Sequence, residues 1–394
     1  MDKTITVITT KSNNLDGSVG NSICRWAQAY YLNSKCNFEY KIILNKEKWS
    51  ELNLVEFPHT ELRSIDMTLS YHVVDCDLMR EVIIDNKIDN FIKHDHLIIE
   101  EWIIFDNCVI IDPRDSIRYK FLWDGPDPIS LIKFKSKNIE NFFKDEFSDF
   151  ISIHIRRYHC VMITQKQIAT LPEEIREDFS RDYRKHSTVY LEGWKQTAEQ
   201  IVEIVNSGLR SHSTYLHPFI PDKQFYSVID HVLDYNIDQK FYISTDIPKK
   251  YYQYYKEKYR NIYDKYDYLE KFESIVRDNY SENILNFDTK INGIENYYDK
   301  KEHFVFGNLL DLFALSNSKL IVQSYLSSWG RIAKRMNDVE QIILPISSET
   351  NSRSTKPHQF YSILRKTYNY KLKYSEIAKL KSLNIDTLDP NLGQ

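Results

Sequence analysis

The chain has 394 residues, a formal net charge of −4 at pH 7 and a hydrophobic fraction of 42%. These values are typical of a globular protein with two domains. The sequence has no extended basic stripe, which argues against nucleic acid as a partner, and no apolar run with the length of a membrane span.

Five cysteines are scattered along the chain without a CxxC spacing, which is typical of free thiols in a reducing compartment. Residues 1–8 begin directly with a strand pattern and lack the features of a signal peptide. We therefore expect a cytoplasmic protein without an integral membrane segment. The oligomeric state does not follow from the sequence.

The first elements in the chain are a strand over 4–10, a loop over 11–21 and a helix over 22–34. A strand, a glycine-bearing loop and a helix form the opening unit of a nucleotide-binding α/β half. The loop contains Gly17 and Gly20 but no GxGxxG motif. By itself it is a weak signal for phosphate binding.

Asp75-Cys76-Asp77 follows an apolar segment over 70–74 and has the form of a DxD metal motif. Two carboxylates in a tripeptide can hold Mg²⁺ or Mn²⁺ on a nucleotide diphosphate. The tripeptide is also common by chance, and an aspartate after a strand often caps the next element. The capping interpretation is favoured.

The strongest chain breaker is Asp124-Gly125-Pro126-Asp127-Pro128. It predicts a domain linker that continues to about residue 149 and includes a helix over 131–147. The resulting division is an N-terminal Rossmann-like domain on the acceptor side, a C-terminal nucleotide-sugar-binding domain and a helical tail, over residues 1–130, 150–345 and 346–394.

Strand and helix patterns alternate through the second half, which predicts a parallel sheet covered on both faces. The predicted strands cover 151–157, 240–244 and 319–323. The predicted helices cover 221–233, 249–259 and 306–315, with another from 331 and a last one over 373–383 in the tail.

Polar side chains follow each of these strands, at the edge where open α/β sheets bind ligands. Arg156 and Arg157 can pair bidentately with a diphosphate. Asp246 can accept hydrogen bonds from a ribose or a base. Ser327 and Ser328, with the backbone NH groups of the next helix, can bind phosphate. Each feature alone is also compatible with a solvated pair or an ordinary cap.

The order of these segments resembles the fucosyltransferase superfamily of GT-B fold. The match is sparse over residues 4–340, and its motifs lie in the order that the family shows. They are Gly17-Ser18-Val19-Gly20-Asn21, the Ala27-x-Ala29 and Leu32 pattern, His154-Ile155-Arg156-Arg157, Thr245-Asp246 and Ser327-Ser328-Trp329.

The resemblance implies an α/β, GT-B-like fold with two Rossmann-like domains whose parallel sheets face a cleft. It implies inverting transfer of a sugar, most simply L-fucose from GDP-fucose, to a glycan or protein acceptor. No metal or other cofactor is required. The implied catalytic residues are Arg156, Asp16 and Asn21. The implied donor-binding residues are Gly20, His154, Arg156, Arg157, Thr245, Asp246, Ser327, Ser328 and Trp329.

Within this set, Arg156 and the serine loop would stabilise the leaving diphosphate without a cation. Asn21 would lie near the reacting sugar, and Asp16 would act as general base if its pKa is raised. Arg157 would pack beneath the site, and His154 would be a hydrogen-bonding residue at the sheet edge.

The chain departs from the family at Tyr158-His159-Cys160, where relatives often have an acidic residue, and in a long charged insert over 160–215. Another donor, such as GDP-mannose, GDP-rhamnose or a UDP- or dTDP-linked sugar, therefore stays open. Two further alternatives are a non-catalytic carbohydrate-binding protein and a metal-dependent transferase that uses Asp75 and Asp77.

Overall fold

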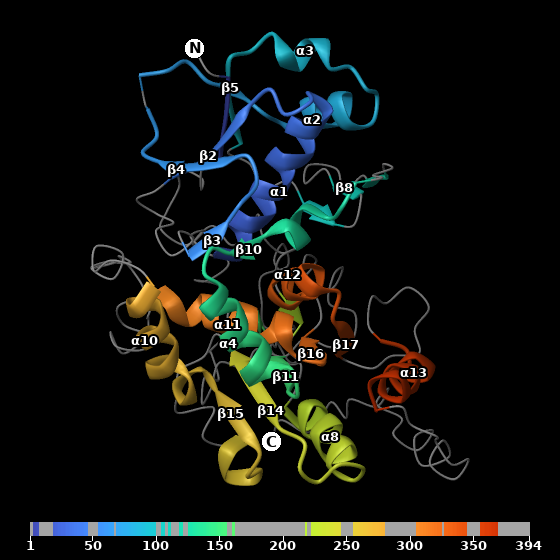
Figure 1. The fold of residues 1–394 in the computed structure, drawn as a ribbon. Coiled ribbons are helices and arrows are strands. Elements are labelled where there is room, and N and C mark those ends of the chain that lie inside the picture. The colour runs from blue at the N-terminus through green and yellow to red at the C-terminus, as the bar shows by residue number, and fades with distance from the viewer. Residues whose placement is uncertain are drawn as a thin grey trace, which may run out of the picture. The chain divides into compact units, whose positions relative to one another are not determined.

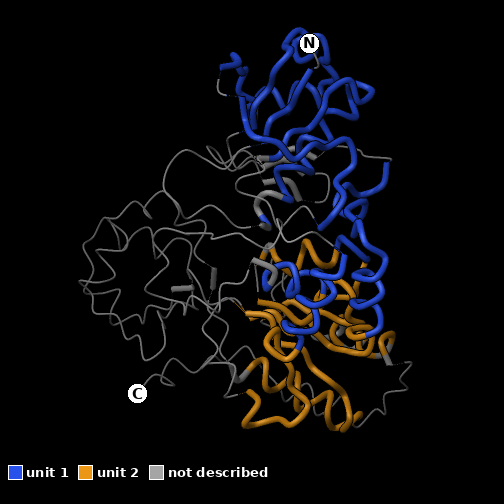
Figure 2. Tube along the Cα trace, turned by 60° about the vertical axis from the view of Figure 1, so that its left-hand side comes forward, with its two compact units in different colours: residues 1–145, 268–313, 335–337 blue, residues 146–267, 314–334, 338–394 orange. Residues whose placement is uncertain are grey.

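The computed structural model describes residues 3–7, 19–45, 54–66, 68–99, 104–106, 109–111, 118–120, 125–155, 160–161, 217–218, 222–245, 255–279, 305–324, 327–344 and 355–368. The chain forms two compact units (Figure 2). Unit 1 comprises residues 1–145, 268–313 and 335–337, and unit 2 comprises residues 146–267, 314–334 and 338–394. Each unit contains one five-stranded parallel sheet (Figure 1), which confirms the predicted α/β class with two parallel sheets.

The sheet of unit 1 has the strand order β4-β2-β1-β6-β5, with every neighbouring pair parallel. The strands are β1 Thr4–Val7, β2 Lys41–Asn45, β4 Thr60–Arg63, β5 His72–Val73 and β6 His96–Ile99. The central strand β1 is buried along its whole length. Its sequence alternates between threonine and the apolar residues Ile5 and Val7, and the threonine face is buried as well because the strand lies at the centre of the sheet.

Helix α1, Val19–Lys35, packs against β1 and β2. The side chains that form the apolar side of this helix in the sequence are all buried; they are Ile23, Trp26, Ala27, Tyr30 and Tyr31. The helix begins before its predicted start at Ser22, so Gly20 and Asn21 lie in its first turn.

The predicted helix over 131–147 is wrong in its first part. Lys133–Phe134 is a strand, β10, that pairs antiparallel with β3, Val55–Glu56. Because the backbone is extended there, the helix α4 begins only at Lys137 and ends at Phe147. Before β10, Pro128–Leu131 forms the 3₁₀ helix η2.

An aromatic cluster packs α4 into unit 1. Phe143 lies 5.1 Å from Phe134 and 5.3 Å from Phe272 between ring centroids, and Phe134 lies 3.9 Å from Phe313. Aromatic rings at these separations contribute beyond the area that they bury. The other elements of this unit are α2 Cys76–Ile83, α3 Asp89–Ile92, α10 Leu269–Asn279 and an antiparallel sheet of β7 Ile104–Asp106, β8 Val109–Ile111 and β9 Arg118–Lys120.

The sheet of unit 2 has the order β15-β14-β11-β16-β17, again with all neighbours parallel. The strands are β11 Ile151–Ile155, β14 Phe241–Thr245, β15 Ile262–Asp264, β16 Leu320–Ser324 and β17 Glu340–Leu344. Numbered along the chain, this order is 3-2-1-4-5, which is that of a Rossmann sheet. The three strands predicted from the sequence are the three central ones.

The apolar face of this sheet forms the core of unit 2. Ile151, Ile153 and Ile155 pack in one cluster with residues of α8, Asp222–Leu233, and of α13, Pro357–Tyr368. Sequence alone did not predict α13, and the predicted tail helix over 373–383 lies outside the described residues. Because side chains alternate along a strand, Ser152 and His154 face the opposite side.

The remaining elements are α11 Val305–Asn317, α12 Ser328–Asn337, the 3₁₀ helix η4 Lys265–Asp267 and a short pair of β12 Cys160–Val161 with β13 His217–Pro218. None of the described helices is both long enough and apolar enough to cross a membrane.

Candidate functional site

The strand order of unit 2 marks one position at the carboxyl edge of its sheet. The chain builds outward from β11 in one direction through β14 and β15, and in the other through β16 and β17. The order therefore reverses between β11 and β16. In open α/β sheets, ligands bind outside the carboxyl ends of the strands at such a reversal.

Three polar side chains form a row across the strands on either side of this position. His154 is paired in register with Ser244 on β14 and with Gln323 on β16. All three side chains are at most 3% exposed. The His154 Nδ1 lies 3.3 Å from the Ser244 hydroxyl. This contact agrees with the predicted role of His154 as a hydrogen-bonding residue at the sheet edge.

Buried polar atoms at the Gln323 end of this row, and at Ser327, which follows it in the chain, have no hydrogen-bond partner among the described residues. They are both amide atoms of Gln323 and the Oγ of Ser327. A buried donor or acceptor without a partner costs about 1–3 kcal/mol. Unpaired buried atoms at a strand-order reversal are what a site leaves for the polar groups of a ligand.

Ser327 lies immediately before α12 as its N-cap residue, but its side chain makes no capping hydrogen bond. The first backbone NH groups of a helix have no partner within that helix and favour anions through the helix dipole. A phosphate at this end could therefore bind both the helix NH groups and the Ser327 hydroxyl.

Gly330 allows α12 to lie directly against β16 (Figure 1). A Cβ atom at this position would lie 1.9 Å from the Oε1 of Gln323 and 2.9 Å from its Cδ. The glycine therefore fixes the distance between the helix and the row of polar side chains.

A group of charged side chains lies at the carboxyl end of the edge strand β15. Asp264 is almost fully buried, and its carboxylate pairs with the Lys256 ammonium at 2.9 Å. Burial raises the pKa of Asp264, and Lys256 opposes this effect. Lys256 also pairs with Asp267 at 2.7 Å. These ion pairs stabilise the end of β15, and both carboxylates are bound to Lys256 of the same unit.

The structure brings part of the predicted donor set to one edge. His154, Thr245 and Ser327 lie at the ends of β11 and β14 and at the start of α12, and Trp329 is half-buried in the first turn of α12. Ser328 is placed by its backbone as the first residue of that helix. In unit 1, Gly20 is buried and Asn21 is placed by its backbone, both in α1. Asp16, Arg156, Arg157 and Asp246 lie outside the described residues.

Sequence reasoning missed Ser244, Gln323 and Gly330. Gln323 is a long polar side chain that follows three apolar residues of its strand, and Gly330 directly precedes the helix that the sequence predicts from 331. Gln323 was a signal, because a buried amide side chain usually has a hydrogen-bond partner. Nothing in the sequence indicates that the two residues contact each other.

Asp75, the first aspartate of the DxD-like tripeptide, has the favoured capping role. The Asp75 side chain accepts a hydrogen bond from the Leu78 backbone NH at 2.8 Å and caps α2. Within the described part of the chain, no group of three or more His, Cys, Asp or Glu side chains is arranged so that it could hold a metal ion.

No protein-family model and no curated protein matches the chain. Solved structures that it resembles include fucosyltransferases. For NodZ from Bradyrhizobium the identity is 8%, with 85% of this chain and 93% of that chain covered and a TM-score of 0.34. For a mutant of Arabidopsis thaliana FUT1 in complex with GDP the identity is 11%, with 91% of this chain and 75% of that chain covered and a TM-score of 0.41. For POFUT1 in complex with GDP the identity is 9%, with 88% of this chain and 99% of that chain covered and a TM-score of 0.37.

Proposed function

We propose that the chain is a glycosyltransferase that binds a nucleotide diphosphate sugar, most simply GDP-fucose, at the carboxyl edge of the unit 2 sheet. The observation that carries the proposal is the group of buried atoms of Gln323 and Ser327, at the reversal between β11 and β16, that have no hydrogen-bond partner in the described part of the chain. In the sequence, Arg156 directly follows Ile155, the last residue of β11. The motif order of the fucosyltransferase superfamily supports the choice of donor.

In the proposed reaction, an acceptor oxygen attacks the anomeric carbon of the donor while the bond to the diphosphate breaks, with inversion. The acceptor proton passes to a base, for which Asp16 is the candidate. Negative charge develops on the departing diphosphate. The Arg156 guanidinium and the α12 N-terminus stabilise that charge without a metal ion. A glycan or a protein supplies the acceptor oxygen.

The first test measures nucleotide binding, because it needs no acceptor. Thermal unfolding is followed with GDP, UDP, CDP, ADP and dTDP, each with and without EDTA. A ligand at one hundred times its Kd stabilises the native state by about 2.7 kcal/mol. We expect a shift with GDP that survives EDTA.

The control variants separate the site from general charge effects. Arg156→Ala should abolish the GDP shift. Arg277→Ala removes an exposed guanidinium on α10 and should leave it unchanged. A shift with UDP or dTDP alone would indicate a donor linked to that nucleotide in place of GDP-fucose. A shift that EDTA removes would favour a metal-dependent enzyme. Absence of any nucleotide shift would contradict the proposed enzyme and leave a carbohydrate-binding protein.

A further inference from the structure

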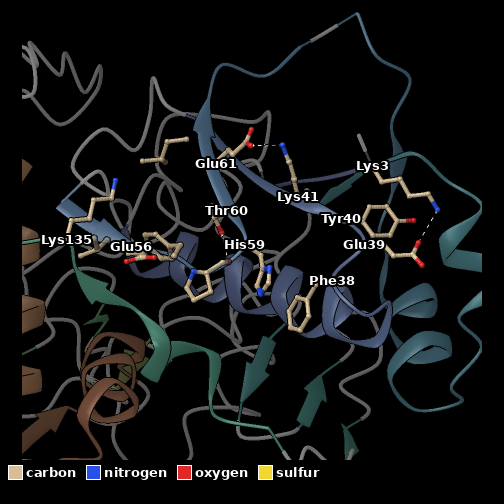
Figure 3. Close-up of a pocket in the computed structure, with 14 residues that line it drawn as sticks. Lys3, Phe38, Glu39, Tyr40, Lys41, Glu56, His59, Thr60, Glu61 and Lys135 are labelled. Carbon is tan, nitrogen blue, oxygen red and sulfur yellow. Dashed lines mark hydrogen bonds and ion pairs between the residues drawn. The ribbon is translucent and has the colours of Figure 1, made fainter. Parts of the chain in front are cut away.

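A cavity lies in unit 1, away from the carboxyl edge of its sheet. Its volume is about 750 Å³, within the range of small-molecule sites. Lys3 precedes β1, Lys41 begins β2 and Thr60 begins β4, and all three line the cavity (Figure 3). These strands are parallel, so the cavity lies at their amino ends. It is therefore distinct from the edge where α/β sheets usually bind ligands.

Two stacked rings form an apolar surface in this cavity. The rings of Phe38 and His59 lie 4.0 Å apart between centroids, with 13° between their planes. Tyr30 contacts the Phe38 ring edge-on at 5.2 Å. Phe38 and His59 both have positive φ, 59° and 57°. This conformation is unfavourable for a bulky residue such as Phe38, whereas histidine adopts it more readily, so the backbone strain lies at Phe38.

Ion pairs line the cavity around the rings. The Lys41 ammonium lies 2.9 Å from the Glu61 carboxylate, and Lys3 lies 3.5 Å from Glu39. Figure 3 shows the Lys41–Glu61 pair on one side of the cavity and the two rings on the other. Glu61 and Lys41 are each about half exposed, so a ligand in the cavity can reach both side chains.

The charges of the described lining are balanced. The ammonium groups are those of Lys3, Lys41 and Lys135, and the carboxylates are those of Glu39, Glu56 and Glu61. A net positive lining would select an anion, and a net negative one a cation. A balanced lining with fixed donors and acceptors beside an aromatic surface suits a neutral, polyhydroxylated molecule. The apolar C–H face of a sugar ring packs on aromatic rings, and its hydroxyl groups pair with charged side chains.

We propose that this cavity is a binding site for a neutral saccharide. The sugar ring packs against the Phe38–His59 pair, and its hydroxyl groups bind the Lys41–Glu61 pair. The site does not depend on the proposed transferase activity, since it lies on unit 1 and uses none of the donor-binding residues.

Saturation-transfer difference NMR tests this proposal, because it detects weak binding and reports which ligand protons contact the protein. The probes are D-glucose, D-galactose, D-mannose and N-acetyl-D-glucosamine, with D-glucose 6-phosphate as the anionic comparison. We expect saturation transfer to the C–H protons of at least one neutral sugar, and no stronger transfer to the phosphorylated one.

The variants remove the rings while keeping the backbone. Phe38→Asn and His59→Asn are chosen because asparagine tolerates positive φ, so both chains should fold. Each should lose at least three-quarters of the signal. His72→Asn, which removes a ring stacked on His94 outside the cavity, should retain it. Arg156→Ala should also retain it, which separates this site from the proposed donor site.

Three results would overturn the proposal. They are no transfer to any of the neutral sugars, a signal that persists in both asparagine variants, and a stronger signal with D-glucose 6-phosphate. Thermal unfolding of each variant confirms that it is folded.

Discussion

Gly330 and Gln323 are in such close contact that a Cβ atom at position 330 would lie 1.9 Å from the Gln323 Oε1. Gln323 is fully buried, so a methyl group added at position 330 would have to displace the end of a packed side chain. This contact sets how closely α12, which carries the Ser327 end of the candidate site, approaches β16.

Gly330→Ala should destabilise the protein and weaken nucleotide binding. The added methyl group improves helix propensity by about 1 kcal/mol, but overpacking a filled site costs about 1–3 kcal/mol. We expect a net loss of about 1 kcal/mol in the free energy of unfolding, measured by urea denaturation. In a Gln323→Ala background the methyl group has room, so Gly330→Ala should cost less there. An equal cost in both backgrounds would show that the close contact is not the cause.

Gln323→Leu should stabilise the free protein and reduce the stabilisation by GDP. The variant removes two buried, unpartnered atoms at similar volume, which should raise the free energy of unfolding by about 1–2 kcal/mol. Thermal unfolding with and without GDP measures both effects. Gln224→Leu is the matched control, since the Gln224 Oε1 is also buried without a partner among the described residues, on α8. It should leave the GDP shift intact.

Asp127→Ala should be more destabilising than Arg335→Met. Asp127 receives two hydrogen bonds from the Arg335 guanidinium, at 2.7 and 2.9 Å, and also caps η2 through the Ile129 backbone NH. Only 11% of the Arg335 side chain is exposed. Removing the aspartate leaves a buried charge unpaired and removes the cap, at a cost of about 3 kcal/mol. In Arg335→Met, Asp127 still caps η2 and is partly exposed to solvent, so its unpaired charge costs less. Urea denaturation of both variants, and of the double variant, measures the difference.

The stability of unit 1 should fall as the pH falls below about 6.5. The imidazoles of His72 and His94 stack at 3.8 Å with 5° between their planes. Burial, followed by the charges of His72 and Lys93, lowers the pKa of His94 from its ordinary value. The unfolded chain then binds a proton more readily than the folded one, so stability is full above the unfolded pKa and is lost on acidification.

NMR titration of His94 and urea denaturation at pH 8 and pH 5.5 measure this dependence. In His72→Gln the neighbouring charge is absent, so the His94 pKa should move back towards its ordinary value and the loss of stability should be smaller. A His94 pKa above its ordinary value would contradict the expectation.

The sequence by itself determined the class of the fold. Alternating strands and helices predicted the parallel sheets, and the central strands of unit 2 lie within a residue or two of where apolar periodicity placed them. These features depend on local pattern and burial, which a single sequence carries. For the same reason the sequence also favoured Asp75 as a cap, since capping involves neighbours in the chain.

Only the tertiary structure decided which side chains meet. His154, Ser244 and Gln323 come from strands that are far apart in the sequence, and their row exists because strand order and register align them. The extended segment at Lys133–Phe134 follows from its pairing with β3, which overrides a helical pattern. The cavity of unit 1 likewise depends on Phe38 and His59, which lie apart in the sequence, stacking ring on ring, and on Phe38 adopting a positive φ that its residue type does not predict.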